Sequence, residues 1–324
     1  MERHRRLTLI ERALGLALMA LVGLVGFLES RSPMAEAARA KKPWLFFLAL
    51  DSTTVQGPPE LFLGVYDPRK PAVEAVYLPG STLVDKWRSL DYFYAHDFSR
   101  HGVPERAAEA EAAAAGAWLS RVPALAQEKP VFLRGIAPVE AGDMPPLQAL
   151  AWIRRPVRNL LAVPATARGL SGLDRLFLAL RLSQIPKENA VPAWLPDRQD
   201  VVYDFFGRLV SGREPAMHRG PVTVEIDNAA GIADLALDAT KILRSRGADV
   251  VSQGNAEGGG GRTVIYDRTG RIQNARAVKR MLSCPSAEVM TRADPDRLVD
   301  VSVILGADCA QAAKETGSWN SSKF

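Results

Sequence analysis

Two acidic residues lie where they could take part in chemistry. Asp51 directly follows the apolar run Leu45–Leu50, and Glu60 directly precedes the run Leu61–Tyr66. If the two runs are neighbouring strands, both carboxylates lie at one edge of a sheet, where they could bind Mg²⁺ or a metal-bound phosphate. The alternative is that they are two loop carboxylates at the mouth of the sheet and bind nothing.

Other residue types that are common in catalytic or metal sites lack the required spacing. His96, Asp97 and His101 match neither one helix face nor a standard zinc motif. The glycine run Gly258–Gly261 leads into a predicted strand, whereas a phosphate-binding loop leads into a helix. The sequence has no Gly-x-Ser-x-Gly elbow or other nucleophile signature. It therefore predicts no complete catalytic site and no metal site.

The two cysteines of the chain, Cys284 and Cys309, both lie near its C-terminal end. They belong to no Cys-x-x-Cys pair or Cys/His cluster, so they do not indicate structural zinc. In an oxidising compartment they would form a disulfide within one small domain. The alternative is two separate buried thiols, because a bridge requires Cα atoms within about 7 Å.

The N-terminus predicts the compartment. Arginines at positions 3, 5, 6 and 12 precede the uncharged run Ala13–Leu28. This run is shorter than the ~20 residues of a typical spanning helix, so it is either a membrane anchor or a cleaved signal. The basic flank keeps the N-terminus in the cytoplasm and sends the following chain across the membrane. We predict a single-pass protein of the cell membrane with its bulk outside the cytoplasm.

Composition and charge limit the remaining classes. The chain has 324 residues, of which 47% are hydrophobic and 24% are charged, as in globular proteins. Its net charge is +5, and much of this excess comes from the N-terminal arginines. The rest of the chain is close to neutral, so nucleic acid is not a predicted partner.

Hydrophobic periodicity predicts an α/β fold with two domains. In the first, three strands (45–50, 61–66 and 73–78) form a meander, and helices follow at 105–122, 147–161 and 173–182. Arg154, Arg155 and Arg158 form the solvated face of the second helix, or contact lipid phosphates. In the C-terminal segment, strands and helices alternate as βαββαβ, which predicts a split sandwich with its helices on one face of the sheet.

The predicted divisions of the chain are a cytoplasmic tail at 1–12, an anchor or signal at 13–28, a spacer at 29–43, the first domain at 44–210, a linker at 211–220, the second domain at 221–310 and a tail at 311–324.

The C-terminal segment resembles the C-terminal domain of LytR–CpsA–Psr cell-envelope proteins. The matching residues are VTVEIDNAAGIADLALDATKILRSRGADVVSQGNA (Val222–Ala256), TVIYDR (Thr263–Arg268) and DVSVILGADC (Asp300–Cys309). Their order is specific: a strand, an Asn-x-x-Gly turn, a helix, Arg-Gly, a strand, Gly-Asn, and a last strand that ends in Leu-Gly. The resemblance implies a protein of the cell envelope.

The first domain looks like a degenerate catalytic domain of the same family. The segments LALD (Leu48–Asp51), Glu60–Val65, Asp67-Pro68 and YLPGST (Tyr77–Thr82) occur in the family's order. The family's enzymes transfer a polymer from a polyprenyl-pyrophosphate carrier to the wall, using acidic residues, Mg²⁺ and arginines. The resemblance places Asp51 at the first acidic position and Glu60 near the second.

The departures from the family pattern predict a loss of the reaction. Gly80 and Ser81 stand where the family has an arginine and an aspartate after its proline, and Val55–Pro59 lacks the expected arginines. The family's Arg-x-x-Arg-Gln-Gln run is reduced to Asp174-Arg175. Losing the groups that bind pyrophosphate costs several kcal/mol of barrier. The remnant site residues are Asp51, Glu60 and Arg175.

We therefore predict a membrane-anchored, non-catalytic envelope protein that binds peptidoglycan or another wall glycan, a polyprenyl lipid, or an envelope protein. The alternative is a phosphotransferase that requires Mg²⁺ and has rebuilt its pyrophosphate site with Arg88, Arg168 and Arg175. A third alternative is transcriptional attenuation, the activity after which the family was named, but the sequence shows no helix-turn-helix. Clustering of Arg175 with the two carboxylates would favour the enzyme, and an apolar cleft would favour binding.

Overall fold

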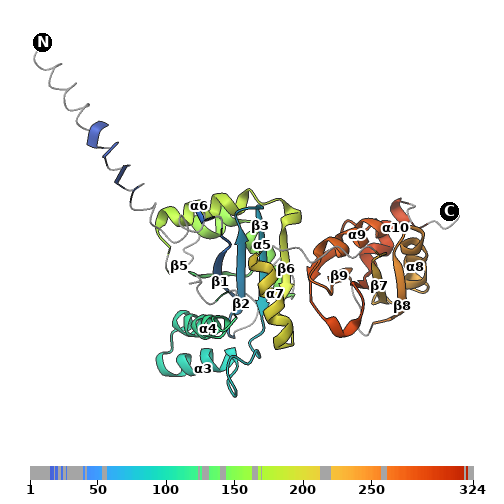
Figure 1. Ribbon diagram of the computed structural model, residues 1–324, viewed down its shortest axis with the longest axis horizontal. Helices are drawn as coiled ribbons and strands as arrows, with labels where there is room; N and C mark the ends of the chain where they lie inside the picture. The colour runs from blue at the N-terminus through green and yellow to red at the C-terminus, as the bar shows by residue number, and fades with distance from the viewer. Residues whose placement is uncertain are drawn as a thin grey trace, which may run out of the picture.

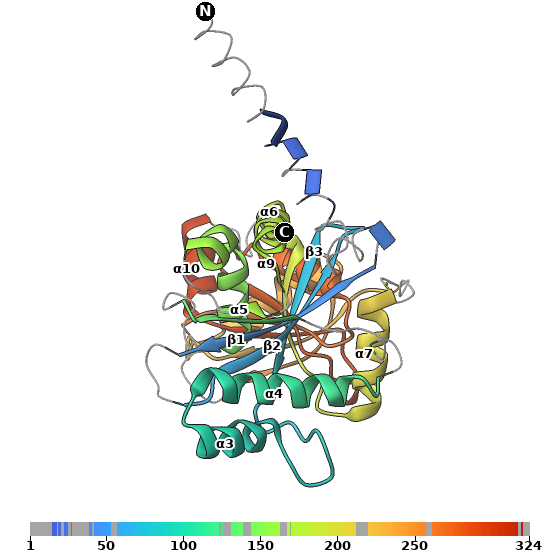
Figure 2. The same ribbon diagram turned by 90° about the vertical axis from the view of Figure 1, so that its left-hand side faces the viewer.

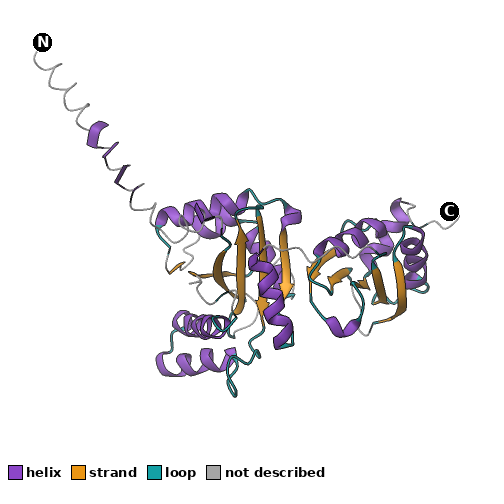
Figure 3. Ribbon diagram, viewed as in Figure 1, coloured by secondary structure: helices purple, strands orange, loops and turns teal. Residues whose placement is uncertain are grey.

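The computed structural model has two lobes, each built from strands and helices (Figures 1 and 3). It describes residues 42–52, 57–122, 125, 131–138, 144–162, 167–168, 170–211, 220–256, 261–316 and 319, and isolated positions between 15 and 40. Within this part of the chain, one sheet of eleven strands runs through both lobes in the order β5-β4-β1-β2-β3-β6-β10-β9-β11-β7-β8. The predicted α/β class is confirmed.

Three apolar segments form the antiparallel meander of the first lobe. They are β1 (Trp44–Asp51), β2 (Glu60–Asp67) and β3 (Ala72–Leu78). The first pairs with the second, and the second with the third, both in antiparallel register. β1 and β2 are buried along nearly their whole length because helices pack on both faces, which explains their continuous apolar sequences. The structure has the three strands that the sequence predicted.

Three shorter strands complete this half of the sheet: β4 (Val131–Ile136), β5 (Ala167–Arg168) and β6 (Ala190–Trp194). β4 lies parallel to β1, β5 pairs antiparallel with β4, and β6 lies parallel to β3. None of them was predicted from the sequence. β6 has the sequence AVPAW, and its alanines and proline are residue types depleted in strands.

Helices cover both faces of this half of the sheet, as the end-on view shows for α3 and α4 on one side and α6 on the other (Figure 2). One layer contains α3 (Leu90–His101), α4 (Pro104–Leu119) and α7 (Gln199–Ser211). The other contains α5 (Pro145–Ile153), the π-helical turn η2 (Arg158–Ala162) and α6 (Gly172–Ser183). Alternate residues of β1 face the two cores: Phe47 and Ala49 pack under α4, and Leu48 and Leu50 pack under α5 and α6.

Two of the three helices predicted for this lobe occur near their expected positions. α4 begins at Pro104, in the first turn where proline is tolerated. α6 begins with a capping box, in which Ser171 and Asp174 bond each other's backbone N–H groups. The helix predicted for 147–161 is wrong in extent, because α5 ends at Ile153. Pro156 follows within one turn and cannot continue the backbone hydrogen bonds.

The second lobe has the strands β7 (Thr223–Asn228), β8 (Asp249–Asn255), β9 (Val264–Asp267), β10 (Glu288–Thr291) and β11 (Val301–Leu305). Its helices are α8 (Leu235–Ser245), α9 (Ile272–Leu282) and α10 (Ala307–Thr316). Residues from all three helices and from β7, β8, β9 and β11 form one core, so the helices lie on one face of the sheet as predicted.

The order of elements in this lobe is longer than the predicted βαββαβ. The structure adds β10 before the last strand and α10 after it. β10 has the sequence EVMT, whose short length and charged first residue give little strand signal. α10 includes residues of the predicted tail at 311–324, and Trp319 donates from its indole Nε1 to the carbonyl of Leu282 at 2.9 Å.

The two lobes meet where β6 and β10 lie side by side. The strands are parallel, with Ala193 opposite Thr291. A side-chain contact crosses the same junction, since Arg198 Nη1 lies 2.8 Å from Asp296 Oδ1. The sheet is therefore continuous from one lobe to the other.

The described part of the chain contains no helix that is long and apolar enough to cross a membrane. Only isolated residues of the predicted anchor or signal at 13–28 are described, and most of the spacer that follows it lies outside the described residues.

Candidate functional site

Asp51 lies at the end of β1 and is bound by an arginine that the sequence analysis missed. Arg134 of the adjacent strand β4 donates from Nε to Asp51 Oδ2 at 2.8 Å and from Nη2 to Oδ1 at 2.9 Å. This is a bidentate pair, the strongest ordinary geometry for a guanidinium and a carboxylate. The Asp51 side chain is 35% exposed and that of Arg134 is 17% exposed. Both oxygens of the carboxylate that could bind a metal are thus already engaged.

Glu60 lies at the same end of the sheet but on its other face. The register sets Glu60 opposite Leu50, one residue before Asp51, and successive residues of a strand point to opposite faces. Glu60 is accordingly hydrogen-bonded to Tyr77 of β3. Burial raises the pKa of the Tyr77 hydroxyl, and the bond to Glu60 raises it further. The two acidic residues therefore do not converge on one point.

The carboxylate of Asp91 lies against Gly80, the position at which the resemblance predicted an arginine. A Cβ placed on Gly80 would lie 1.9 Å from Oδ1 of Asp91, the second residue of α3. The backbone N–H of Asp91 also donates to the carbonyl of Gly80 at 2.9 Å. No side chain fits at position 80 while Asp91 keeps this conformation. A negative group therefore lies beside position 80, where the resemblance predicted an arginine.

A fourth carboxyl group, that of Glu111, is buried near Asp91 and Glu60. Glu111 of α4 is only 1% exposed, and its Oε2 has no hydrogen-bond partner among the described residues. Burial raises the pKa of Glu111 to about 8, and the neighbouring charges of Asp91 and Glu60 contribute to that rise. Glu111 is therefore largely protonated at neutral pH.

We refer to Asp51, Glu60, Asp91, Glu111 and Arg134 as the acidic cluster, a group at one end of the sheet in which Glu60 lies on the other face and interacts with Glu111 only through its charge. Tyr94 of α3 lies among its members: burial raises the pKa of its hydroxyl, Arg134 lowers it, and Asp51 and Glu111 raise it. The acidic cluster contains one guanidinium for four carboxyl groups. Its net charge is negative, which is the opposite of what binding of a pyrophosphate leaving group requires.

The three arginines predicted for a rebuilt pyrophosphate site, Arg88, Arg168 and Arg175, lie in different parts of the first lobe. Arg88 lies in the loop before α3, where its Nε donates to Asp85 Oδ2 at 2.6 Å. Arg175 lies in the first turn of α6, in the helix layer on the opposite face of the sheet from α4. Arg168 lies on β5, opposite Phe132 and one strand beyond Arg134, and its side chain is outside the described residues. The structure shows Asp51 in an ion pair with Arg134.

The carboxylates of Asp51 and Glu60 do not form a set of ligands that fits Mg²⁺. Among the described residues, the one group of three or more potential ligand atoms within 4.8 Å of one another is Cys284, Asp308 and Cys309. The sulfur atoms of that group are joined in a disulfide, so it is not a metal site. Asp51 and Glu60 lie on different faces of the sheet, and no step of a metal-assisted reaction follows from their geometry.

The structure joins Cys284 and Cys309 in a disulfide, with Cα atoms 5.3 Å apart. Cys284 follows α9, and Cys309 lies in the first turn of α10. Both are buried in the core of the second lobe. The bridge therefore fastens the C-terminal helix to the helix layer of this lobe.

The sequence did contain a signal for Arg134. The segment Val131–Ile136 (VFLRGI) is short and mostly apolar, as a buried strand should be, and its position parallel to β1 sets Arg134 beside Asp51. Asp91 and Glu111 had no such signal, because each is one of several acidic residues on a helix whose orientation only the packing defines.

Comparisons with known proteins agree with the geometry of the second lobe. Residues 221–308 match the family model LytR_C, described as LytR cell envelope-related transcriptional attenuator. The chain thus carries a LytR_C domain at its C-terminal end, as its resemblance predicted. No curated protein matches the chain.

Two solved structures are similar to the chain only at a low level. One is Lmo1026 from Listeria monocytogenes, described as a transcriptional factor, with 11% identity, coverage of 75% of this chain and 98% of that one, and a TM-score of 0.20. The other is Lin1025 from Listeria innocua, with 14% identity, coverage of 75% and 99%, and a TM-score of 0.20. At this TM-score neither likeness supports a conclusion about this chain.

Proposed function

We propose that the protein is a membrane-anchored, non-catalytic protein of the cell envelope that binds a wall glycan or a polyprenyl-linked ligand. In this proposal the first lobe is a degenerate LytR–CpsA–Psr domain. The observation that supports it is the close approach of Asp91 to Gly80, since a carboxylate there is unfavourable for the pyrophosphate-binding arginine that the resemblance implies at this position. Support for the envelope comes from the LytR_C domain at residues 221–308.

A phosphate-release assay tests the loss of catalysis. Full-length protein purified in detergent is incubated with a short-chain polyprenyl-pyrophosphate glycan donor and Mg²⁺, beside an arginine-containing member of the family. We expect no release above background. Turnover near ~1 per second, a common enzyme rate, would overturn the proposal.

Binding is tested separately, by mass spectrometry of lipid retained by the purified protein and by co-sedimentation with purified wall glycan. We expect one of the two ligands to be retained by the wild-type protein. Retention of neither by a folded, monodisperse preparation would contradict a binding role, whatever the phosphate assay shows.

One observation favours the phosphotransferase as a second candidate. Arg134 supplies a guanidinium at the first acidic position, where the sequence alone offered none. If phosphate release is found, Asp51→Asn and Arg134→Gln should each abolish it. Unchanged release in both variants would place the reaction elsewhere in the molecule.

The proposed topology rests on the arginines before the run Ala13–Leu28. Reporter fusions placed after Thr166 should be active only with a reporter that works outside the cytoplasm. Activity of a cytoplasm-only reporter at this position would overturn the extracytoplasmic location.

A further inference from the structure

A cleft lies between the two lobes, beside the junction of β6 and β10. Its cavity volume is about 490 Å³, within the range of small-molecule sites. One wall comes from the end of α5 and the turn Lys187–Asn189, and the other from α9 and the start of β10. Apolar side chains such as Leu150, Val191 and Val289 form part of the lining. This cleft is separate from the acidic cluster.

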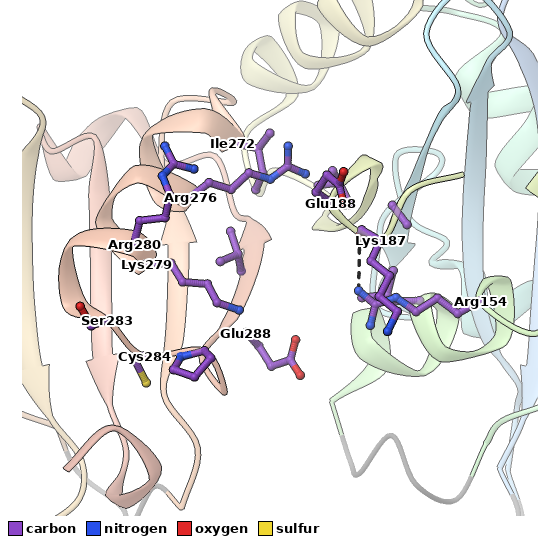
Figure 4. Close-up of a pocket in the computed structure, with 15 residues that line it drawn as sticks. Arg154, Lys187, Glu188, Ile272, Arg276, Lys279, Arg280, Ser283, Cys284 and Glu288 are labelled. Atoms are coloured by element: carbon purple, nitrogen blue, oxygen red, sulfur yellow. Dashed lines mark hydrogen bonds between the residues drawn. The ribbon is translucent and has the colours of Figure 1, made fainter. Parts of the chain in front are cut away.

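The charged side chains of the cleft are mostly basic. Figure 4 shows Arg276, Lys279 and Arg280 projecting from α9, and Arg154 and Lys187 on the opposite wall. Two carboxylates, Glu188 and Glu288, also line the cleft. The lining therefore has five basic and two acidic side chains and a net positive charge.

These basic groups outnumber the carboxylates of the cleft and, among the described residues, are not tied up in ion pairs with them. Within the described part of the chain, none of the five forms an ion pair with a carboxylate. Lys279 Nζ instead donates to the carbonyl of Ala287 at 2.5 Å, and Arg154 Nη2 donates to the carbonyl of Lys187 at 3.5 Å. Their positive charges remain available to a ligand.

Electrostatic coupling shows that the cations interact across the cleft. Burial lowers the pKa of Lys279, Glu288 partly offsets this, and Arg154 of the opposite wall lowers it further. Burial likewise lowers the pKa of Arg276, against the opposing effect of Glu188 and Glu74, and Arg280 on the same helix face adds to the lowering. Like charges at this helical spacing are unfavourable unless an anion lies between them.

We propose that this cleft binds a phosphate group carried on a small organic ligand. Arg276 and Arg280 have the fork-shaped donors that match phosphate oxygens, and Lys279 and Arg154 add charge from the two walls. The apolar part of the lining accepts the uncharged part of the ligand. The phosphate comes either from a phosphorylated sugar or from a lipid headgroup, and the site holds the two lobes together when it is occupied.

The test is calorimetric titration of full-length protein in a non-ionic detergent with three probes: sodium pyrophosphate, a hexose 1-phosphate and monomeric short-chain phosphatidylglycerol. We expect saturable binding of at least one probe, and weakening on the order of tenfold or more in Arg276→Gln/Arg280→Gln. Tighter binding of the sugar phosphate assigns a glycan source, and tighter binding of the phospholipid assigns a lipid source.

Two further variants keep the test independent of folding defects and of general charge. Arg154→Gln lies on the other lobe and should also weaken binding. Arg100→Gln/Lys241→Gln removes two positive charges from exposed helices outside the cleft, and should leave binding unchanged. Equal weakening in this control, or no binding of any probe by the wild-type protein, would overturn the proposal.

Discussion

Replacement of Glu111 by glutamine should change how the stability of the protein depends on pH. The substitution keeps the shape of a side chain that is 1% exposed on α4 and removes its ability to ionise. Burial, and then the charges of Asp91 and Glu60, raise the pKa of Glu111 from 4.5 to about 8 in the folded protein. The folded state therefore holds this proton more tightly than the unfolded chain does.

The sign and size of the change in stability follow from this rise in the pKa of Glu111. The stabilisation is fully present below about pH 4.5 and is lost as the pH rises toward 8. One pKa unit corresponds to about 1.4 kcal/mol, so ionisation destabilises the folded form by roughly 4 to 5 kcal/mol. Between pH 5 and 8 the wild-type protein should lose about 1.4 kcal/mol per pH unit through this group. Glu111→Gln should not show this loss.

The assay is urea unfolding followed by tryptophan fluorescence, at intervals from pH 5 to pH 8.5, on full-length protein in detergent. The free energy of unfolding of the variant minus that of the wild type should increase steadily over this range. Other groups that titrate here, such as Glu74 with its pKa raised to about 7 by burial and by Asp267, are common to both proteins and cancel in the difference.

The matched control is Glu105→Gln on the same helix. Glu105 is half-buried in the first turn of α4, so its replacement should change stability by less than about 1 kcal/mol, through the helix dipole. Parallel pH curves for wild type and Glu111→Gln would refute the reasoning, because they would show that Glu111 titrates alike in the folded and unfolded states.

Three further predictions concern packing and covalent structure. Gly80→Ala should lower the free energy of unfolding by about 1–3 kcal/mol in urea titrations, and adding Asp91→Ala should recover most of the loss, because the new Cβ meets Asp91 Oδ1. Unreduced, unfolded protein should show no titratable thiol from Cys284 and Cys309, and reduction should cost about 3 kcal/mol. Trp152→Ala should cost about 3–5 kcal/mol, since the indole is 1% exposed; a loss below 1 kcal/mol would contradict its place in the core.

The sequence predicted elements that have a strong local signal. The strands β1 and β2 are continuous apolar runs, β3 alternates between buried and partly exposed residues, and α4 and α6 have a proline or a capping residue at their first turn. Those features are encoded within a few residues, so no knowledge of the rest of the chain is needed. The elements that were missed, such as β6 and β10, exist because neighbouring strands pair with them.

The acidic cluster shows the same difference between features encoded in the local sequence and features that depend on distant parts of the chain. The position of Asp51 at a strand end followed from its local sequence, but its partner Arg134 is 83 residues away and reaches it through the parallel pairing of β1 and β4. The separation of Asp51 from Glu60 onto two faces depends on the register of β1 and β2, which an unaligned sequence does not fix. Gly80 was visible in the sequence, whereas the side chain of Asp91 that lies against it was not.

The pairing of β6 with β10 has a consequence for solubility. Each strand would be the open edge of its own lobe if the other were absent, and an open edge of unpaired N–H and C=O groups invites self-association. β6 is mostly buried and uncharged, and it has one proline, Pro192, to discourage further pairing. Each lobe therefore acts as a cap for the other. A fragment that ends within 212–219 should aggregate more readily than the intact chain, through the strand that it leaves uncovered.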